Sequence, residues 1–108
     1  MNDVMAAVKK VAPKLAEISD GIIYDDVWER PNLSRRDRSL ITIAALVALN
    51  LPLSIGPHVR RGLVNGLTKD EIAEVITHIA FYAGWPVAVS ACQIAAEVFE
   101  GKDLHPEA

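Results

Sequence analysis

Two histidines in the body of the sequence carry the side chains best suited to move a proton near neutral pH. His58 lies in "SIGPHVRRG", and we predict that it opens a short helix over residues 57–65. Because the N-terminal end of a helix disfavours positive charge, this position predicts a neutral imidazole that can accept or relay a proton. The alternative is a surface histidine that merely begins a helix.

His78 is the second candidate, and it shares a predicted helix face with two other polar side chains. Glu74 lies four residues before it and Tyr82 four residues after it, which is the spacing of neighbours on a helix. The three could act as an orienting carboxylate, an acid–base imidazole and a phenol, or simply form a half-buried face. One Glu–His pair supplies too few ligands for a metal, so no metal site is predicted.

Arginines form two groups that could recognise an anion. The six are Arg30, Arg35, Arg36, Arg38, Arg60 and Arg61. Arg35 and Arg36 follow Ser34, the predicted N-cap of a helix over residues 34–49, where a cation opposes the helix dipole. Solvation explains most arginines in a first turn, but a guanidinium fork that binds a carboxylate would explain this placement too. We expect at least one arginine to hold a substrate carboxylate, and the spacing does not say which.

The segment "FYAGWP" places three aromatic residues at the end of the helix that carries His78. Phe81 is expected in the core, whereas Tyr82 and Trp85 either cap an apolar pocket or fill space between helices. Cys92 lies among alanines and is expected to be a small buried residue. As the chain's one cysteine, it excludes an internal disulfide and any cysteine-pair redox motif.

The elements that must position these residues are helices. No alternation typical of strands appears, and we predict an all-α fold, a compact bundle of five to six helices. The helix over residues 34–49 is apolar around its circumference after Ser39, which predicts a central position. "NLPLSIGP" is predicted to be a loop and residues 102–108 a loose tail. The remaining helices are predicted over residues 3–19, with an interruption near Pro13, and over residues 22–28, 57–65, 68–84 and 86–101.

Length and composition complete the prediction. The 108 residues fit a single domain, 1–108, and 51% of them are hydrophobic, although only 6% are aromatic. Because small domains leave much surface exposed, this aliphatic excess predicts a homo-oligomer. The net charge of −3 argues against a nucleic-acid partner. The apolar run at residues 40–49 is too short for a bilayer, and no secretory signal precedes it, so we expect a cytoplasmic protein without a membrane partner.

Three segments together resemble the carboxymuconolactone decarboxylase family. They are "VWERPNLSRRDRSLITIAALVAL", "HVRRGLVNGLTKDEIAEVITHIAFYAGWPVAVSA" and, within the second, "FYAGWP". The resemblance covers about residues 20–99 and implies an all-helical trimer or hexamer with a cofactor-free active site between helices and subunits. The same superfamily includes alkylhydroperoxidase-D-like proteins, which need a Glu, a C-x-x-C pair and a following His.

Only the last of those peroxidase residues has a counterpart here, at His58. Ser39 stands at the glutamate position, and Leu51 and Ser54 stand at the cysteine positions. Without the thiol pair, dithiol peroxidase chemistry has no nucleophile, so this activity is not expected.

The resemblance implies decarboxylation of 4-carboxymuconolactone or a related small carboxylated lactone in aromatic-acid catabolism. Loss of carbon dioxide pushes electrons onto the lactone carbonyl, and the resulting dienolate must be protonated at carbon. The expected proton donor is His58, and the expected substrate contacts are Arg35, Arg38, His78, Tyr82 and Trp85. Close relatives carry charged residues where this chain has "NLPLSIGP", which leaves a second function open: a small-molecule-binding or structural oligomer without this reaction.

Overall fold

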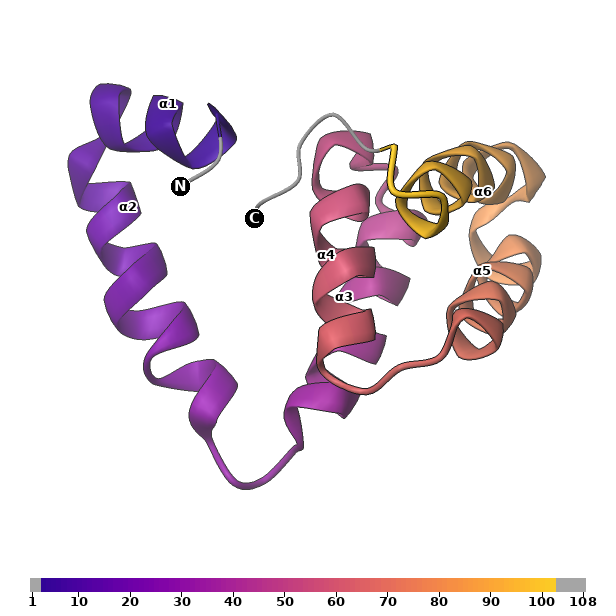
Figure 1. Ribbon diagram of the computed structural model, residues 1–108, viewed down its shortest axis with the longest axis horizontal. Helices are drawn as coiled ribbons and strands as arrows, with labels where there is room; N and C mark the ends of the chain where they lie inside the picture. The colour runs from indigo at the N-terminus through magenta and orange to yellow at the C-terminus, as the bar shows by residue number, and fades with distance from the viewer. Residues whose placement is uncertain (1–2, 103–108) are drawn as a thin grey trace.

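The computed structural model describes residues 3–102, and within that range it is all-helical, as predicted (Figure 1). A π-helical segment, η1, and a 3-10 segment, η2, lie between the second and third α-helices. The elements in chain order are α1 (Asp3–Val11), α2 (Pro13–Ile18), η1 (Ser19–Tyr24), η2 (Val27–Glu29), α3 (Arg35–Ala48), α4 (Pro52–Val64), α5 (Lys69–Ala83) and α6 (Trp85–Phe99). Of the tail predicted for residues 102–108, all but Lys102 lies outside the described residues.

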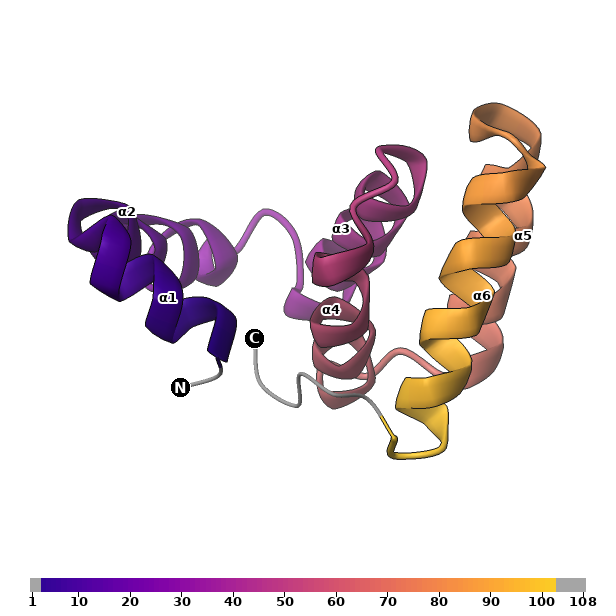
Figure 2. The ribbon, with the colours of Figure 1, turned by 90° about the horizontal axis from the view of Figure 1, so that it is seen from above.

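The helices form two parts, a body made of α3 to α6 and an N-terminal arm made of α1, α2 and η1. Within the body, α3 packs on α4 and α5, and α6 packs on α4 and α5. The arm projects from the body in both views and joins it through η2, which packs on α3 (Figures 1 and 2). The predicted interruption near Pro13 is confirmed, because α2 begins at this proline, which cannot continue the hydrogen-bond ladder of α1. The single helix predicted over residues 22–28 was wrong, since this stretch contains the end of η1, a turn at residues 25–26 and the start of η2.

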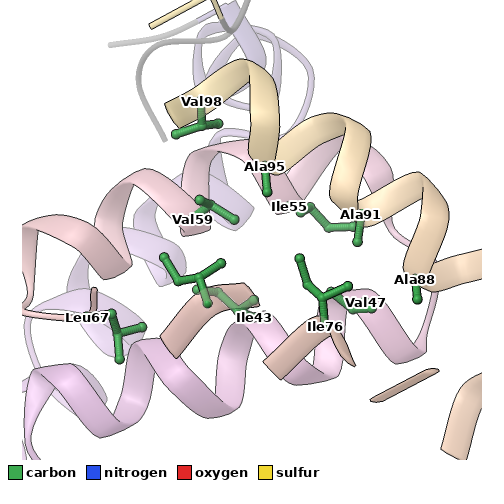
Figure 3. Close-up of a cluster of buried hydrophobic side chains, with 11 residues drawn as sticks. Ile43, Val47, Ile55, Val59, Leu67, Ile76, Ala88, Ala91, Ala95 and Val98 are labelled. Carbon is green, nitrogen blue, oxygen red and sulfur yellow. The ribbon is translucent and has the colours of Figure 1, made fainter. Parts of the chain in front are cut away.

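The core lies where the four body helices meet (Figure 3). Ile43, Ile55 and Ile72 come from three different helices, and each is at most 1% exposed. Small residues of α6, among them Ala91 and Ala95, let this helix approach the others closely. Burial of each large aliphatic side chain contributes roughly 1.5–3 kcal/mol, so these contacts hold the body together.

Helix α3 begins as predicted but is not buried on every side. The Ser34 hydroxyl accepts a hydrogen bond from the Asp37 amide at 3.0 Å, which confirms the predicted N-cap. Its buried residues recur every four positions, at Ser39, Ile43 and Val47, whereas Ile41 is 54% exposed. Within a single chain, the helix therefore buries one face and leaves another apolar face open.

Helix α4 begins earlier than predicted, because "NLPLSIGP" is mostly helical. Pro52 occupies the first turn, where its missing N–H costs nothing, and Pro57 lies inside the helix. Gly56 and Pro57 are buried, and a Cβ on Gly56 would meet side chains of α6 at 3.5 Å. Packing against α6 thus overrides the loop propensity of Pro and Gly.

The remaining helix ends follow the sequence prediction. Thr68 and Glu71 form the predicted capping box, with hydrogen bonds of 2.9 and 3.0 Å. Gly66 and Gly84 end α4 and α5 with φ of +105° and +110°, a conformation that favours glycine. No helix within residues 3–102 combines the length and apolar character needed to cross a membrane.

Candidate active site

His58 lies inside α4 rather than at its start, because the helix begins six residues earlier, at Pro52. Its ring stacks on the Trp28 ring, with centroids 6.1 Å apart and planes inclined by 24°. The Nδ1 atom is buried and has no hydrogen-bond partner among the described residues. A histidine that merely opens a surface helix is therefore excluded.

The imidazole of His58 is neutral near pH 7, as predicted, but for a different reason. Burial, together with the smaller effect of the nearby positive charge of Arg61, lowers the pKa of His58 to about 4. Both effects disfavour imidazolium. The neutral ring has one nitrogen that accepts a hydrogen bond, so an acidic group of a ligand could satisfy the ring.

Arg61, one turn along α4 from His58, is held by two aromatic rings. Its guanidinium carbon lies 4.1 Å from the centroid of the Tyr24 ring and 5.6 Å from that of Trp28, both within cation–π range. These side chains border a hollow of about 320 Å³, here called the arginine hollow. Its lining residues are Tyr24, Trp28, Glu29, Arg35, Arg61, Val64 and Asn65.

The predicted carboxylate ligands Arg35 and Arg38 lie in different surroundings. Arg35 lines the arginine hollow and makes two hydrogen bonds to Glu29, of 3.0 and 2.6 Å. This pairing lowers the pKa of Glu29 and raises that of Arg35. Arg38 donates from Nη2 to the carbonyl of Arg30 at 3.1 Å, and its Nε is buried without a hydrogen-bond partner in the described chain.

His78 and Tyr82 pack on each other on α5, as their spacing predicted, with ring centroids 5.0 Å apart. They are not brought to the arginine hollow of their own chain. Instead, His78 lines a second, larger hollow of about 410 Å³ between α3 and α5. We call it the α3–α5 groove, and its lining residues are Leu40, Ile41, Ala44, Glu71, Glu74, Val75, His78 and Ile79.

Two expectations about burial on α5 and α6 were wrong. Phe81, predicted in the core, is 79% exposed, and Cys92, predicted to be buried, is exposed on α6. Tyr82 and Trp85 are also mostly exposed, so neither fills space between helices of this chain. The cause is the rotation of α5 and α6, which turn smaller residues such as Ile76 and Ala91 inward.

Tyr24 and Trp28 line the arginine hollow but were not predicted as site residues. Their spacing of four residues within a predicted short helix places both rings on one side of it, and the rings lie 5.9 Å apart. This spacing of two aromatic residues, together with the six arginines of the chain, could have predicted a pair of rings that binds a guanidinium group.

The three positions that hold the glutamate and the two cysteines in the peroxidases are occupied here by Ser39, Leu51 and Ser54. Ser39 is fully buried and accepts a hydrogen bond from the Asn65 amide nitrogen at 3.0 Å. Leu51 precedes α4, and Ser54 lies in its first turn. Within residues 3–102 no group of three or more His, Cys, Asp or Glu side chains is arranged to hold a metal.

The sequence profile of the carboxymuconolactone decarboxylase family matches residues 13–97. The chain belongs to this family. It is 44% identical over 84 residues to a 4-carboxymuconolactone decarboxylase of Acinetobacter baylyi, covering 78% of this chain and 63% of that protein. A nitrosuccinic acid decarboxylase of Metarhizium robertsii is 40% identical over 68 residues, which cover 63% of this chain and 48% of that protein.

A third relative of this family member is an uncharacterized 15.0 kDa protein of Paracoccus denitrificans. It is 31% identical over 102 residues, which cover 92% of this chain and 75% of that protein. The chain thus spans about 63% and 48% of the lengths of the two decarboxylases.

The buried imidazole of His58 predicts a pH-dependent stability. Between its ordinary pKa of 6.5 and the folded value of about 4, the unfolded chain binds a proton that the folded chain does not. The free energy of unfolding therefore falls as pH falls, with roughly 2 kcal/mol lost through His58 between pH 7 and pH 5. Urea unfolding at both pH values, at one protein concentration, should show a smaller loss in His58→Gln by about this amount. An equal loss in both proteins would contradict the prediction.

Proposed function

We propose that this protein decarboxylates a small carboxylated lactone, 4-carboxymuconolactone or a close analogue, without a cofactor. Membership of the family and the names of two relatives, both decarboxylases of small acids, support the reaction class. The single observation that carries the proposal is His58, a neutral imidazole with an unsatisfied buried nitrogen, whose ring stacks on Trp28 in the lining of the arginine hollow.

Binding begins with the charges of the substrate. Arg61 and Arg35 attract a carboxylate into the arginine hollow, where the guanidinium fork matches its two oxygens. Glu29 competes for Arg35, so a substrate carboxylate must displace or share this partner. Arg61 is held over Tyr24 and Trp28 and so meets the carboxylate with little loss of side-chain freedom.

The reaction then needs one proton at carbon. The bond to the leaving carboxylate breaks, carbon dioxide departs, and the electron pair moves through the double bond onto the lactone carbonyl. His58 delivers a proton to the ring carbon of the resulting dienolate, and solvent reprotonates the imidazole. Because the imidazole is neutral in the free protein, it must first take up a proton, and the negative charge of the bound substrate favours that uptake.

His78, Tyr82 and Trp85 are proposed to contact the substrate from a neighbouring subunit. They do not line the hollow of their own chain, but they are exposed and therefore available to another copy. Arg38 is proposed as a supporting residue, because its hydrogen bond to the Arg30 carbonyl positions the segment that follows Trp28.

Incubation of the purified protein with 4-carboxymuconolactone tests the proposal. Stoichiometric release of carbon dioxide and formation of the enol-lactone are expected. A folded, assembled protein that releases none would favour the second function, an oligomer that binds small carboxylates without this reaction. Binding of unreactive lactone carboxylates, measured by calorimetry, would then identify that alternative.

Arg61→Gln is expected to raise KM and lower kcat/KM by roughly 10- to 100-fold, because one charge-assisted hydrogen bond to a carboxylate contributes about 1.5–3 kcal/mol. If the carboxylate held by Arg61 is retained through the reaction, kcat should change far less than KM. Steady-state kinetics measure both. Lys102→Gln removes the same charge from an exposed residue outside the hollow and should leave the kinetics unchanged. An Arg61→Gln variant with wild-type KM would exclude this role.

A further inference from the structure

Glu29 occupies the position on Arg35 that a substrate carboxylate would take. Its two oxygens accept hydrogen bonds from Nε and Nη2 of Arg35 at 3.0 and 2.6 Å, which is the two-pronged pairing of a guanidinium with a carboxylate. Both side chains line the arginine hollow. The Glu29 side chain is 46% exposed and that of Arg35 is 63% exposed, so the pairing is weak and another carboxylate can replace Glu29.

Glu29 follows Trp28 directly in the 3-10 segment η2, so the two side chains move together. No residue of η2 is fully buried, and the packing of η2 alone therefore holds it only weakly. Polar contacts that join this segment to α3 include the Glu29–Arg35 pair and the hydrogen bond of 3.1 Å from Arg38 to the Arg30 carbonyl. The Glu29–Arg35 pair thus helps to fix the place of Trp28.

Trp28 in turn covers the imidazole of His58. The two rings stack with centroids 6.1 Å apart, and the Nδ1 atom of His58 is buried without a hydrogen-bond partner among the described residues. Burial is the main cause that disfavours a positive charge on this ring. A proton donor must carry that charge, so the covered imidazole cannot serve as a donor until the cover loosens.

The charged groups beside the imidazole act on it in both directions. Those that line the arginine hollow are Arg61 on α4, Arg35 on α3 and Glu29 on η2. The two arginines disfavour imidazolium by their sign, whereas Glu29 favours it. Helix α6, which also packs on α4, meets Gly56 with apolar side chains.

We propose that Glu29 is a positioning residue, an internal ligand of Arg35 that holds Trp28 against His58 until a substrate carboxylate replaces it. This inference rests on the proposed function, because it requires the arginine hollow to receive a carboxylate. When that carboxylate binds Arg35, Glu29 is released and Trp28 loosens. The uncovered imidazole then takes up a proton from solvent and can deliver it to carbon. Substrate binding and proton uptake are thereby coupled.

Replacing Glu29 by glutamine separates a positioning role from a purely electrostatic one, because the two roles change the pKa of His58 in opposite directions. Loss of a negative charge beside the ring would lower this pKa, whereas release of Trp28 should raise it from about 4 toward 6.5. Histidine NMR titration of the free, folded protein measures the pKa, and His58→Gln assigns the resonance. A lowered or unchanged pKa in Glu29→Gln overturns the proposal.

Asp25→Asn is the matched control for this titration. It removes an exposed carboxylate from the turn before η2, at a residue outside the lining of the arginine hollow. Because Asp25 does not bind Arg35, the pKa of His58 should stay at its wild-type value. A rise in Asp25→Asn as large as that in Glu29→Gln would also overturn the proposal.

Fluorescence of Trp28 tests the exchange on Arg35. The chain has two tryptophans, so a Trp85→Phe background leaves Trp28 as the reporter. The ligand is paraconate, a saturated lactone with one carboxylate and no double bond to drive loss of carbon dioxide. Bound paraconate should increase the quenching of Trp28 by acrylamide when Glu29 is present. In Glu29→Gln the quenching should be high before ligand is added.

The same titrations give the affinity for paraconate. Glu29→Gln should bind it roughly 3- to 10-fold more tightly, because a competing carboxylate is gone and an exposed ion pair competes only weakly. Both proteins carry Trp85→Phe, so any effect of that substitution cancels. Weaker binding by Glu29→Gln, or unchanged quenching with ligand bound, overturns the proposal.

These measurements need no turnover and so separate the coupling from the proposed reaction. A protein that releases no carbon dioxide but shows the raised pKa and the exchange would keep the coupling and exclude the decarboxylation. An active enzyme in which Glu29→Gln lowers the pKa of His58 would keep the decarboxylation and exclude the coupling.

Discussion

Replacing His58 by glutamine is expected to lower kcat by roughly 10²–10⁴-fold, the usual contribution of a positioned acid or base. Glutamine keeps a polar group of similar reach beside Trp28 but cannot deliver a proton to carbon. The variant should bind unreactive carboxylates with little change in affinity, because Arg61 and Arg35 line the hollow in either case. Full activity in a folded variant would exclude His58 as the proton donor.

The pH profile separates a catalytic His58 from a structural one. The pH dependence of kcat/KM reports the pKa of His58 in the free protein. If the reacting form is imidazolium, kcat/KM should fall as pH rises above about 4, by up to tenfold per pH unit. The kcat value reports the complex, where substrate charge raises the pKa, and should therefore remain level to a higher pH. A purely structural histidine would give the same profile in wild type and His58→Gln. Partial rescue of His58→Ala by added imidazole would support the proton-transfer role.

Most helices and most helix ends could be predicted from the sequence, because they depend on interactions between residues close together in the chain. Ser34, Thr68 and Glu71 cap their helices as predicted, and Gly66 and Gly84 end theirs. The early start of α4 was not readable. There the deciding interaction is the packing of Gly56 against α6, between residues nearly forty positions apart.

Burial was harder to predict than helicity. The sequence shows that α3 and α5 are apolar, but only the packing decides that Ile43 faces the core and Ile41 and Phe81 face outward. Phe81 was predicted in the core because it is hydrophobic, but α5 turns the smaller Ile76 toward the core instead.

The candidate site was predicted in part, because its components come from distant segments. The neutral His58 was anticipated, but the cause is burial and the charge of Arg61 rather than a helix end. Tyr24 and Trp28 were missed because their role depends on Arg61, more than thirty residues away in the chain.

Truncating Ile43 to alanine is expected to destabilise the body by about 3 kcal/mol, within the range of 2–5 for a fully buried aliphatic residue. Ile43→Val should cost only about 0.5–1.5 kcal/mol, which provides the graded control. Urea unfolding at pH 7 measures both. Equal losses for the two variants would mean that the cavity collapses or that water fills it.

The same residue explains why α4 carries glycine at position 62. A Cβ on Gly62 would lie 2.9 Å from Leu67 Cδ1 and 3.0 Å from Ile43 Cδ1, closer than carbon atoms pack. Gly62→Ala alone should therefore lose, through crowding, the roughly 1 kcal/mol that alanine otherwise gains in a helix. In the Ile43→Ala background one of the two clashes disappears, so the added methyl should be tolerated better by about 1 kcal/mol. A double-mutant cycle measures this coupling, and strictly additive losses would show that Ile43 and Gly62 do not determine the separation of α3 and α4.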